Sequence, residues 1–170
     1  ERVSRIVDSD TNRRIDVYVT PDEDRQRQVY LFYRDLNGLY AVENRDNSNA
    51  WWQGEYAWVH FTYVPAGRRP MVGQRVFIQG EMCGYGAGAN NEMHFDEALG
   101  AYQGMLYLKQ GFYNYAYVLE KPGMKQDESI FEGSYCQTQN VYDVLLYFRP
   151  VGARYDHVIG YASVDYNKLR

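Results

Sequence analysis

The chain has 170 residues, of which 45% are hydrophobic and 24% charged, and its formal net charge is −4. This composition is ordinary for a globular protein, and the length fits one domain with a sizeable core, so extended disorder is not expected. The lack of a basic excess argues against a nucleic-acid-binding protein. No apolar run approaches the roughly 18 residues of a membrane-spanning helix.

The chain begins at Glu1, without an initiator methionine or a signal peptide. We therefore expect a processed or excised piece of a longer protein. Residues 1–35 are predicted to be either an interdomain segment or the first strands. Residues 36–170 are predicted to form a β-sandwich domain, and a single domain over residues 1–170 is the alternative.

Alternating apolar and polar residues predict strands along most of the chain. In chain order the predicted strands cover residues 13–20, 28–35, 39–44, 55–63, 74–80, 105–108, a stretch from 111 to the turn at 122–123, 142–148 and 157–164. Asn37-Gly38 between two of these strands favours a tight hairpin. Helical periodicity is not sustained anywhere, so the pattern predicts an all-β protein, an antiparallel β-sandwich with an immunoglobulin-like core.

One predicted strand carries a stripe of tyrosines. Tyr113, Tyr115 and Tyr117 are spaced by two, so their rings share one face of the strand. Such a stripe is typical either of a sugar-binding surface or of one wall of a sandwich core. The surrounding strands favour the core, with the hydroxyls reaching backbone or water.

The chain offers few groups for catalysis. Its only histidines are His60, His94 and His157, and a GxSxG nucleophile motif is absent. His157 follows Asp156, but adjacency in sequence does not make a catalytic geometry. We therefore expect a protein that is not an enzyme.

Other polar clusters have ordinary structural interpretations. Three acidic clusters are interpreted as solvated turn charges rather than as a cation site or an acid–base pair, and they are Asp8/Asp10, Asp22/Glu23/Asp24 and Asp127/Glu128. Gly84, Gly86 and Gly88 predict a mobile loop, because the GK[ST] ending of a phosphate-binding loop is missing. Cys83 and Cys136 lack metal-site spacing, and both a disulfide and two free thiols remain open. No metal or cofactor site is predicted.

Exposed rings are the remaining candidates for binding. Trp51 and Trp52 stand side by side in a polar loop, where tryptophans stack on sugars or anchor a protein partner. Folding back over the core is the alternative for both rings. Together with Tyr85 they are the candidate contacts for a partner or a glycan.

The stretch from Val76 to Gly123 resembles the early-set immunoglobulin-like domains, which include glycogen-binding modules. The resemblance rests on V-F-I-x-G, on M-x-F at residues 93–95 and on a G-x-Y-x-Y strand that begins at Gly111. In those modules the loop before this strand carries a sugar-stacking tryptophan, whereas the matching loop GEMCGYGAG has none. A carbohydrate-binding module of the early-set type is the alternative function.

Five segments in order carry a second resemblance, which covers residues 14–166. They are YRDLNGLYAVENRD, EYAWVHFTY, LKQGFYNYAYV, EGSYCQTQNVYDVLLYFRP and GARYDHVIGYASV. Together they resemble the C-terminal domain of the type IX secretion system plug protein family of Bacteroidota, formerly a domain of unknown function. One departure is Cys136–Gln139, where the family more often has acidic residues before the threonine and before the asparagine.

This resemblance implies a non-enzymatic interaction or structural domain. The family's plug closes the periplasmic end of the type IX secretion translocon, so the implied partner is the outer-membrane β-barrel subunit of that pore. The implied location is the periplasm, in association with the outer membrane. The family has no cofactor and no catalytic residues to carry over to this chain.

Overall fold

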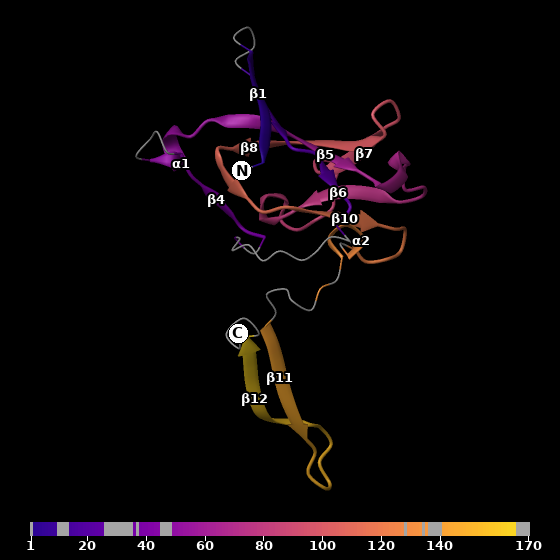
Figure 1. Cartoon of the computed structure of the whole chain (residues 1–170). Helices are drawn as coiled ribbons and strands as arrows, with labels where there is room; N and C mark the ends of the chain where they lie inside the picture. Colours follow the sequence, from indigo (N-terminus) through magenta and orange to yellow (C-terminus); the bar gives the residue numbers. More distant parts are fainter. Residues whose placement is uncertain are drawn as a thin grey trace. The chain divides into compact units, whose positions relative to one another are not determined.

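The computed structural model describes residues 2–9, 14–25, 36, 38–44, 49–127, 129–133, 135 and 141–165 (Figure 1). The chain divides into two compact units. The first comprises Glu1–Val29 and Tyr33–Ser134, and the second comprises Tyr30–Phe32 and Tyr135–Arg170. We call them the larger unit and the hairpin unit.

The larger unit is built of strands with short helical turns between them. Its elements are β1 (Val3–Ser9), β2 (Arg14–Val19), β3 (Asp22–Glu23), β4 (Tyr40–Val42), α1 (Ala50–Gln53), β5 (Tyr56–Val64), η1 (Ala66–Arg68), β6 (Arg75–Gln79), η2 (Glu81–Cys83), β7 (Glu92–Asp96), β8 (Ala101–Lys109), β9 (Gly111–Tyr113), β10 (Ala116–Glu120) and α2 (Ser129–Glu132). The main sheet has the order β1-β2-β5-β8-β7-β6-β10, and β3 also pairs with β5. A second sheet consists of β4 and β9.

The all-β prediction is confirmed, with pairings that are mostly antiparallel. The exceptions among the described strands are β2 and β3, which both run parallel to β5. A parallel pairing cannot be closed by a tight turn, and long connections here separate β5 from both partners. The main sheet is therefore mixed, not purely antiparallel as the sequence predicted.

Most of the predicted strands that lie within the described residues are present. Alternation alone located β2, β4, β5, β6, β8 and the two strands of the hairpin unit. It did not locate β1 or β7, and it placed a turn where β3 forms. The predicted strand at residues 28–35 and Asn37 of the predicted hairpin lie outside the described residues, and β4 pairs with β9.

The core forms because the main sheet folds over on itself. β5 and β10 are not neighbours in the sheet, yet the Tyr63 and Tyr117 rings lie 5.4 Å apart. The rings of Phe61 and of Tyr115, the residue just before β10, lie 4.8 Å apart. In the view of Figure 1, β5 and β8 lie above β6 and β10. The residues enclosed in this way are Phe61, Tyr63, Val76, Ile78, Met93, Tyr102, Leu106, Tyr117, Leu119 and Phe131.

Glycine permits the closest approach in this core. A Cβ atom at Gly104 of β8 would lie 2.9 Å from Cδ1 of Ile78 and 3.0 Å from Cγ of Met93. Such distances are shorter than van der Waals contact, so a side chain at Gly104 would force Ile78 and Met93 to shift.

The tyrosine stripe belongs to this core only in part, since Tyr117 is a core residue and Tyr115 packs against the core, and the three hydroxyls differ in their partners. The strand is interrupted between β9 and β10, so Tyr113 lies in one sheet and Tyr117 in the other. The Tyr113 hydroxyl donates to the carbonyl of Lys109 at 2.6 Å, as the prediction of a backbone partner requires. The hydroxyls of Tyr115 and Tyr117 instead donate to the carboxylate of Asp22, at 2.9 and 2.8 Å.

Asp22 therefore corrects the sequence prediction for its acidic cluster. It is buried, not a solvated turn charge, and its other carboxylate oxygen accepts a hydrogen bond from the Arg2 guanidinium. Burial and the nearby carboxylate raise the pKa of Tyr115 and of Tyr117, so both hydroxyls stay protonated donors. Through Asp22, strand β3 is fixed to β10.

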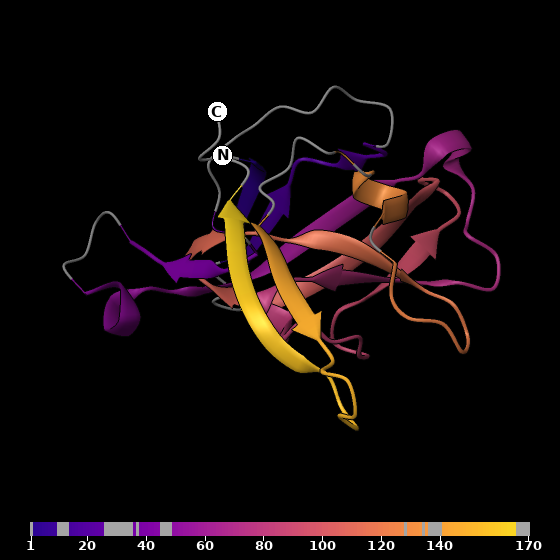
Figure 2. The same cartoon turned by 90° about the horizontal axis from the view of Figure 1, so that it is seen from below.

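The hairpin unit consists of β11 (Val141–Phe148) and β12 (His157–Asp165), paired antiparallel (Figure 2). Arg149 and Asp156 close its turn with a two-pronged ion pair, at 2.8 and 3.0 Å. Every residue of β11 is exposed, although the strand is almost wholly apolar or aromatic. Taken by itself, the hairpin buries neither of its two faces.

Candidate functional site

Aromatic side chains gather on the outward face of β2, β5 and β8. Alternation on β5 turns Tyr56, Trp58 and His60 away from the core residues Phe61 and Tyr63. The Trp58 ring lies 4.9 Å from that of Tyr107 on β8, and the Tyr56 ring lies 5.1 Å from it. On the other side of β5, the Tyr18 and His60 rings stack at 4.4 Å. We call Tyr18, Tyr56, Trp58, His60 and Tyr107 the ring face.

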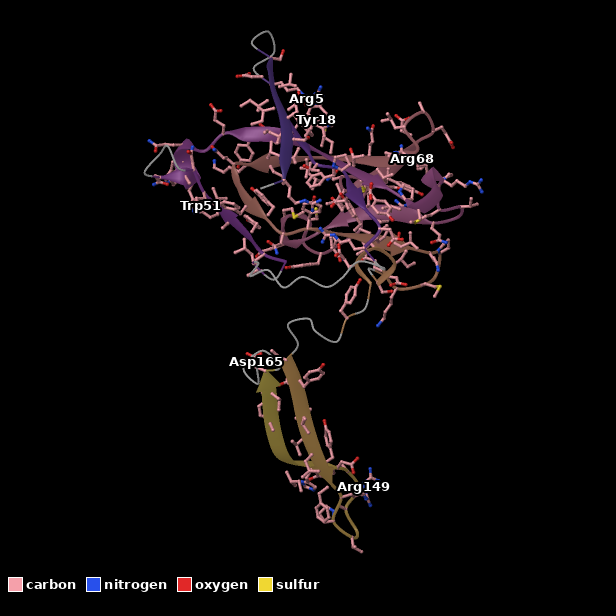
Figure 3. The ribbon with its side chains drawn as sticks, viewed as in Figure 1. Arg5, Tyr18, Trp51, Arg68, Arg149 and Asp165 are labelled. Carbon is pink, nitrogen blue, oxygen red and sulfur yellow. The ribbon has the colours of Figure 1, made fainter. Side chains whose placement is uncertain are left out.

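Cations lie over these rings. The ammonium of Lys109 is 4.6 Å from the centre of the Tyr56 ring, and the Arg14 guanidinium is 5.4 Å from that of Trp58. Arg5 of β1 lies 4.1 Å from the Tyr18 ring (Figure 3). Such contacts hold long cationic side chains against an aromatic surface.

A single carboxylate orders one end of the ring face. Asp16 accepts two hydrogen bonds from Arg14 and lies 2.6 Å from Nε2 of His60. The hydrogen bond from Arg14, followed by that from His60, lowers the pKa of Asp16. The charged carboxylate therefore fixes Arg14 over Trp58 and orients the His60 ring under Tyr18.

A groove of about 590 Å³ lies beside the ring face. Trp58 and Tyr107 form part of one wall, and the glycine-rich loop before β7, from Gly86 to Asn91, forms part of the other. Cys83 also lines the groove, with a free thiol whose pKa is raised by burial. Cys136, the predicted alternative partner of Cys83, lies outside the described residues.

The glycine-rich loop is held by side chains rather than being a simple connection. The buried amide of Asn91 donates to the carbonyls of Ile78 and Gly86, at 2.7 and 2.8 Å, and its oxygen accepts from the N–H of Gly88 at 2.9 Å. The Tyr85 hydroxyl donates to the carbonyl of Gly38 at 2.9 Å. These bonds fix the loop wall of the groove.

The three predicted contact residues are not brought together. Trp51 and Trp52 lie on the short helix α1, with 64% and 85% of their surface exposed, so neither folds back over the core. Ring contacts to other described residues are absent for both. Tyr85 is half exposed, and its hydroxyl holds its own loop through the carbonyl of Gly38. These three residues therefore do not make a flat platform.

A second hollow, of about 660 Å³, lies on the opposite face of the same strands. Ile15, Val17, Val59 and Leu108 form its apolar floor, and Phe112 of β9 lies at its side. Because this floor is apolar, the hollow suits an apolar group. Among the described residues, the titratable groups that line it are Arg2, Glu55, Lys109, Tyr113 and Tyr115.

The described residues hold no cluster of three metal-ligating side chains. None of the helices that the structure describes has the length and apolar content to cross a membrane. Of the other two histidines, His94 is exposed on β7, and His157 lies against the ring of Tyr155 at 4.6 Å.

Sequence reasoning missed the ring face as a unit. Alternation on residues 55–63 predicts that Tyr56, Trp58 and His60 share one face and that Phe61 and Tyr63 lie on the other. It could not supply Tyr18 and Tyr107, because these rings reach the ring face through pairings between distant strands.

Comparison with solved structures shows similarity to a protein that has no assigned function. A crystal structure of a hypothetical protein from Parabacteroides merdae is similar to this chain, with a TM-score of 0.77 and 30% sequence identity. The similarity covers 96% of this chain and 40% of that protein, so the chain spans about two fifths of its length. No protein-family model and no curated protein matches the sequence.

Proposed function

We propose that this chain is a non-enzymatic interaction domain, the C-terminal part of a plug protein that closes the periplasmic end of the type IX secretion translocon. The single observation that carries an interaction role is the ring face. There, four aromatic rings and His60 stand on one outer surface with three cations held against them. The link to the plug family rests on the five ordered sequence segments.

The ring face has the composition of a protein contact surface. Tyrosine, tryptophan and arginine are the residues most enriched among those that dominate binding energy. Tyr107 is 56% exposed, so its ring area is available to a partner. Arg5 and Lys109, whose charges are not paired with a carboxylate among the described residues, suit a partner surface that carries carboxylates. Such charges would raise the association rate more than the final affinity.

The proposed fold is an early-set immunoglobulin-like sandwich. A mainly antiparallel sheet that folds over so that β5 packs against β10 supports this finer description.

Taken by itself, the hairpin unit also favours an interaction role. A two-stranded hairpin is marginally stable in water, and contiguous exposed apolar surface is typical of contact sites.

Co-purification tests the proposed function. The full-length protein that contains this chain would be recovered, by an affinity tag, from detergent-solubilised outer membranes. Recovery together with a very large β-barrel subunit supports the plug function. Recovery of the protein without that subunit contradicts it.

Two single substitutions test which surface makes the contact. Tyr107→Ala removes the central ring of the ring face, and we expect roughly a tenfold or greater loss of the co-purified subunit. Trp52→Ala removes a ring that is even more exposed but lies on α1, and we expect no change. The reverse result would assign the contact to α1 and contradict the ring face.

Carbohydrate binding is the second candidate, because Tyr56, Tyr107 and Trp58 follow one another at sugar-stacking distances. The test is retention on an insoluble polysaccharide, with elution by soluble fragments of the same polymer. Retention that Tyr107→Ala abolishes, in the absence of a co-purified membrane subunit, would favour the glycan over the plug.

A further inference from the structure

Strand β8 is paired along both sides for only part of its length. β5 pairs with it from Tyr102 to Lys109, whereas β7 pairs with it only from Ala101 to Gln103. At Met93 and Glu92, β7 instead pairs with β6. In the part of the chain that the structure describes, β8 therefore lacks a strand on its β7 side from residue 104 to residue 109.

The hydrogen-bonding groups on this open side can be identified. Gln110 donates its N–H to the Glu55 carbonyl at 2.8 Å, so by alternation Met105 and Tyr107 direct their N–H and C=O groups away from β5. Within the described residues these backbone groups have no hydrogen-bond partner. These outward-facing backbone groups recur roughly every 7 Å along β8, because residues two apart on a strand are separated by that distance. The backbone groups of an added strand recur at the same spacing.

The groove beside the ring face runs along this open edge. Its lining includes Met105, Leu106, Tyr107 and Leu108, which are consecutive. Because successive side chains of a strand point to opposite faces, a groove that touches all four must follow the edge and not one face. Across the groove lies the loop from Gly86 to Asn91, which Asn91 holds in place. The space of about 590 Å³ is therefore bounded by a strand edge and by a fixed wall.

We propose that this groove takes an extended peptide segment of a partner protein, which adds to β8 as a strand. The backbone groups of Met105 and Tyr107 recognise the peptide main chain, as in other cases of strand addition. The apolar lining, which includes Trp58, Met82 and Leu108, selects apolar side chains at alternate positions of the peptide. A sugar offers no regular repeat of amide donors and acceptors for this edge. The inference does not rest on the proposed plug function.

The test uses acetyl-Lys-Val-Thr-Val-Thr-Val-Lys-amide as the probe and the complete chain as the receptor. Amide hydrogen exchange, resolved by NMR, is measured for Met105 and Tyr107. Both amides are expected to exchange rapidly in the free protein and to become at least about tenfold slower with the peptide. Slow exchange in the free protein, at low or at high protein concentration, would show that the edge is already occupied and would overturn the proposal.

Two N-methylated versions of the peptide test the hydrogen bonds themselves. One is methylated on its valines and the other on its threonines, so only one of them loses the donors that face β8. We expect one version to bind roughly tenfold more weakly for each hydrogen bond lost, and the other to bind like the parent peptide. Equal binding of both versions would overturn strand addition.

Substitutions in the loop test the location. Ala87→Trp places a large ring in the groove from an exposed position and should weaken peptide binding about tenfold or more, with the fold retained. Ala98→Trp, at an exposed turn outside the groove, is the matched control and should bind like the parent protein. Unchanged binding to Ala87→Trp would overturn the groove as the site.

Discussion

Strands β10 and β11 resemble each other in sequence and differ completely in environment. β10 reads AYVLE and β11 reads VYDVLLYF, so both are dominated by aliphatic and tyrosine side chains. In β10 the three central residues are buried, whereas in β11 every residue is exposed. The apolar content of a strand therefore shows that it needs to be covered, and not what covers it.

The difference follows from the number of layers around each strand. β10 pairs with β6 and lies against β5 through the Tyr117 and Tyr63 rings, and α2 adds Phe131. β11 has only β12 as a hydrogen-bonded neighbour within the described residues. We therefore expect substitutions and changes of pH to alter the stability of the larger unit, which contains β10, much more than that of the hairpin unit.

The largest effect is expected from alkali, which acts on the larger unit through its buried tyrosines. Burial raises the pKa of Tyr63 and of Tyr113 to about 12, and burial with the Asp22 carboxylate raises the pKa of Tyr115 and of Tyr117. In the unfolded chain these hydroxyls lose their protons near pH 10. Between about pH 10 and pH 12 the unfolded state therefore binds fewer protons, and the stability of the larger unit falls as the pH rises.

Tyrosinate absorbance and circular dichroism, followed together, check this expectation. A fraction of the tyrosines should titrate late, with a loss of β-structure in the same pH interval. Ionisation of all tyrosines in one step near pH 10, with the fold intact, would contradict the burial of these hydroxyls.

The next largest effect is expected from truncating one leucine in each strand. Leu119 of β10 is 1% exposed, so Leu119→Ala should lower the free energy of unfolding by about 3 kcal/mol. Leu146 of β11 is 57% exposed, so Leu146→Ala should change it by about 0.5 kcal/mol or less. Urea denaturation followed by tryptophan fluorescence reports on the larger unit, which holds all three tryptophans. A cost for Leu146→Ala equal to that for Leu119→Ala would remove the contrast between the strands.

Alternation located the strands because it is a local property. It predicted the run of β5 with Phe61 and Tyr63 on one face and Trp58 on the other, and the core confirms these faces. It also identified β11 and β12, although nothing in their sequence tells whether their faces are covered.

What the sequence could not supply is any contact that depends on distant pairing. The parallel pairing of β2 with β5 brings Tyr18 onto His60, and a separate pairing brings Tyr107 onto Trp58. Asp22 is the clearest case. Its charged neighbours in sequence favour a turn, and only the fold places it beneath two tyrosine hydroxyls.

The smallest of the three expected effects compares one hydroxyl in each unit. Tyr117 donates to Asp22 in the buried core, and Tyr161 donates to Asp143 at 2.8 Å on the exposed hairpin. Tyr117→Phe leaves a buried carboxylate short of one donor, so we expect a loss of about 2 kcal/mol in the free energy of unfolding. Tyr161→Phe leaves a carboxylate that water can solvate, so we expect a change within about 0.5 kcal/mol.

A double substitution separates the hydrogen bond from the packing of the ring. If the loss in Tyr117→Phe comes from the unpaired charge, Asp22→Asn should reduce the further cost of Tyr117→Phe, because the neutral amide needs a donor less. Additive costs would assign the effect to packing around the ring.

For Tyr161, the exchange rates of amide hydrogens in β11 and β12 give the matching measurement. If Tyr161→Phe destabilised the hairpin as much as Tyr117→Phe destabilises the core, water would not be replacing the Tyr161 hydroxyl. Exposure would then not explain the difference between the two strands.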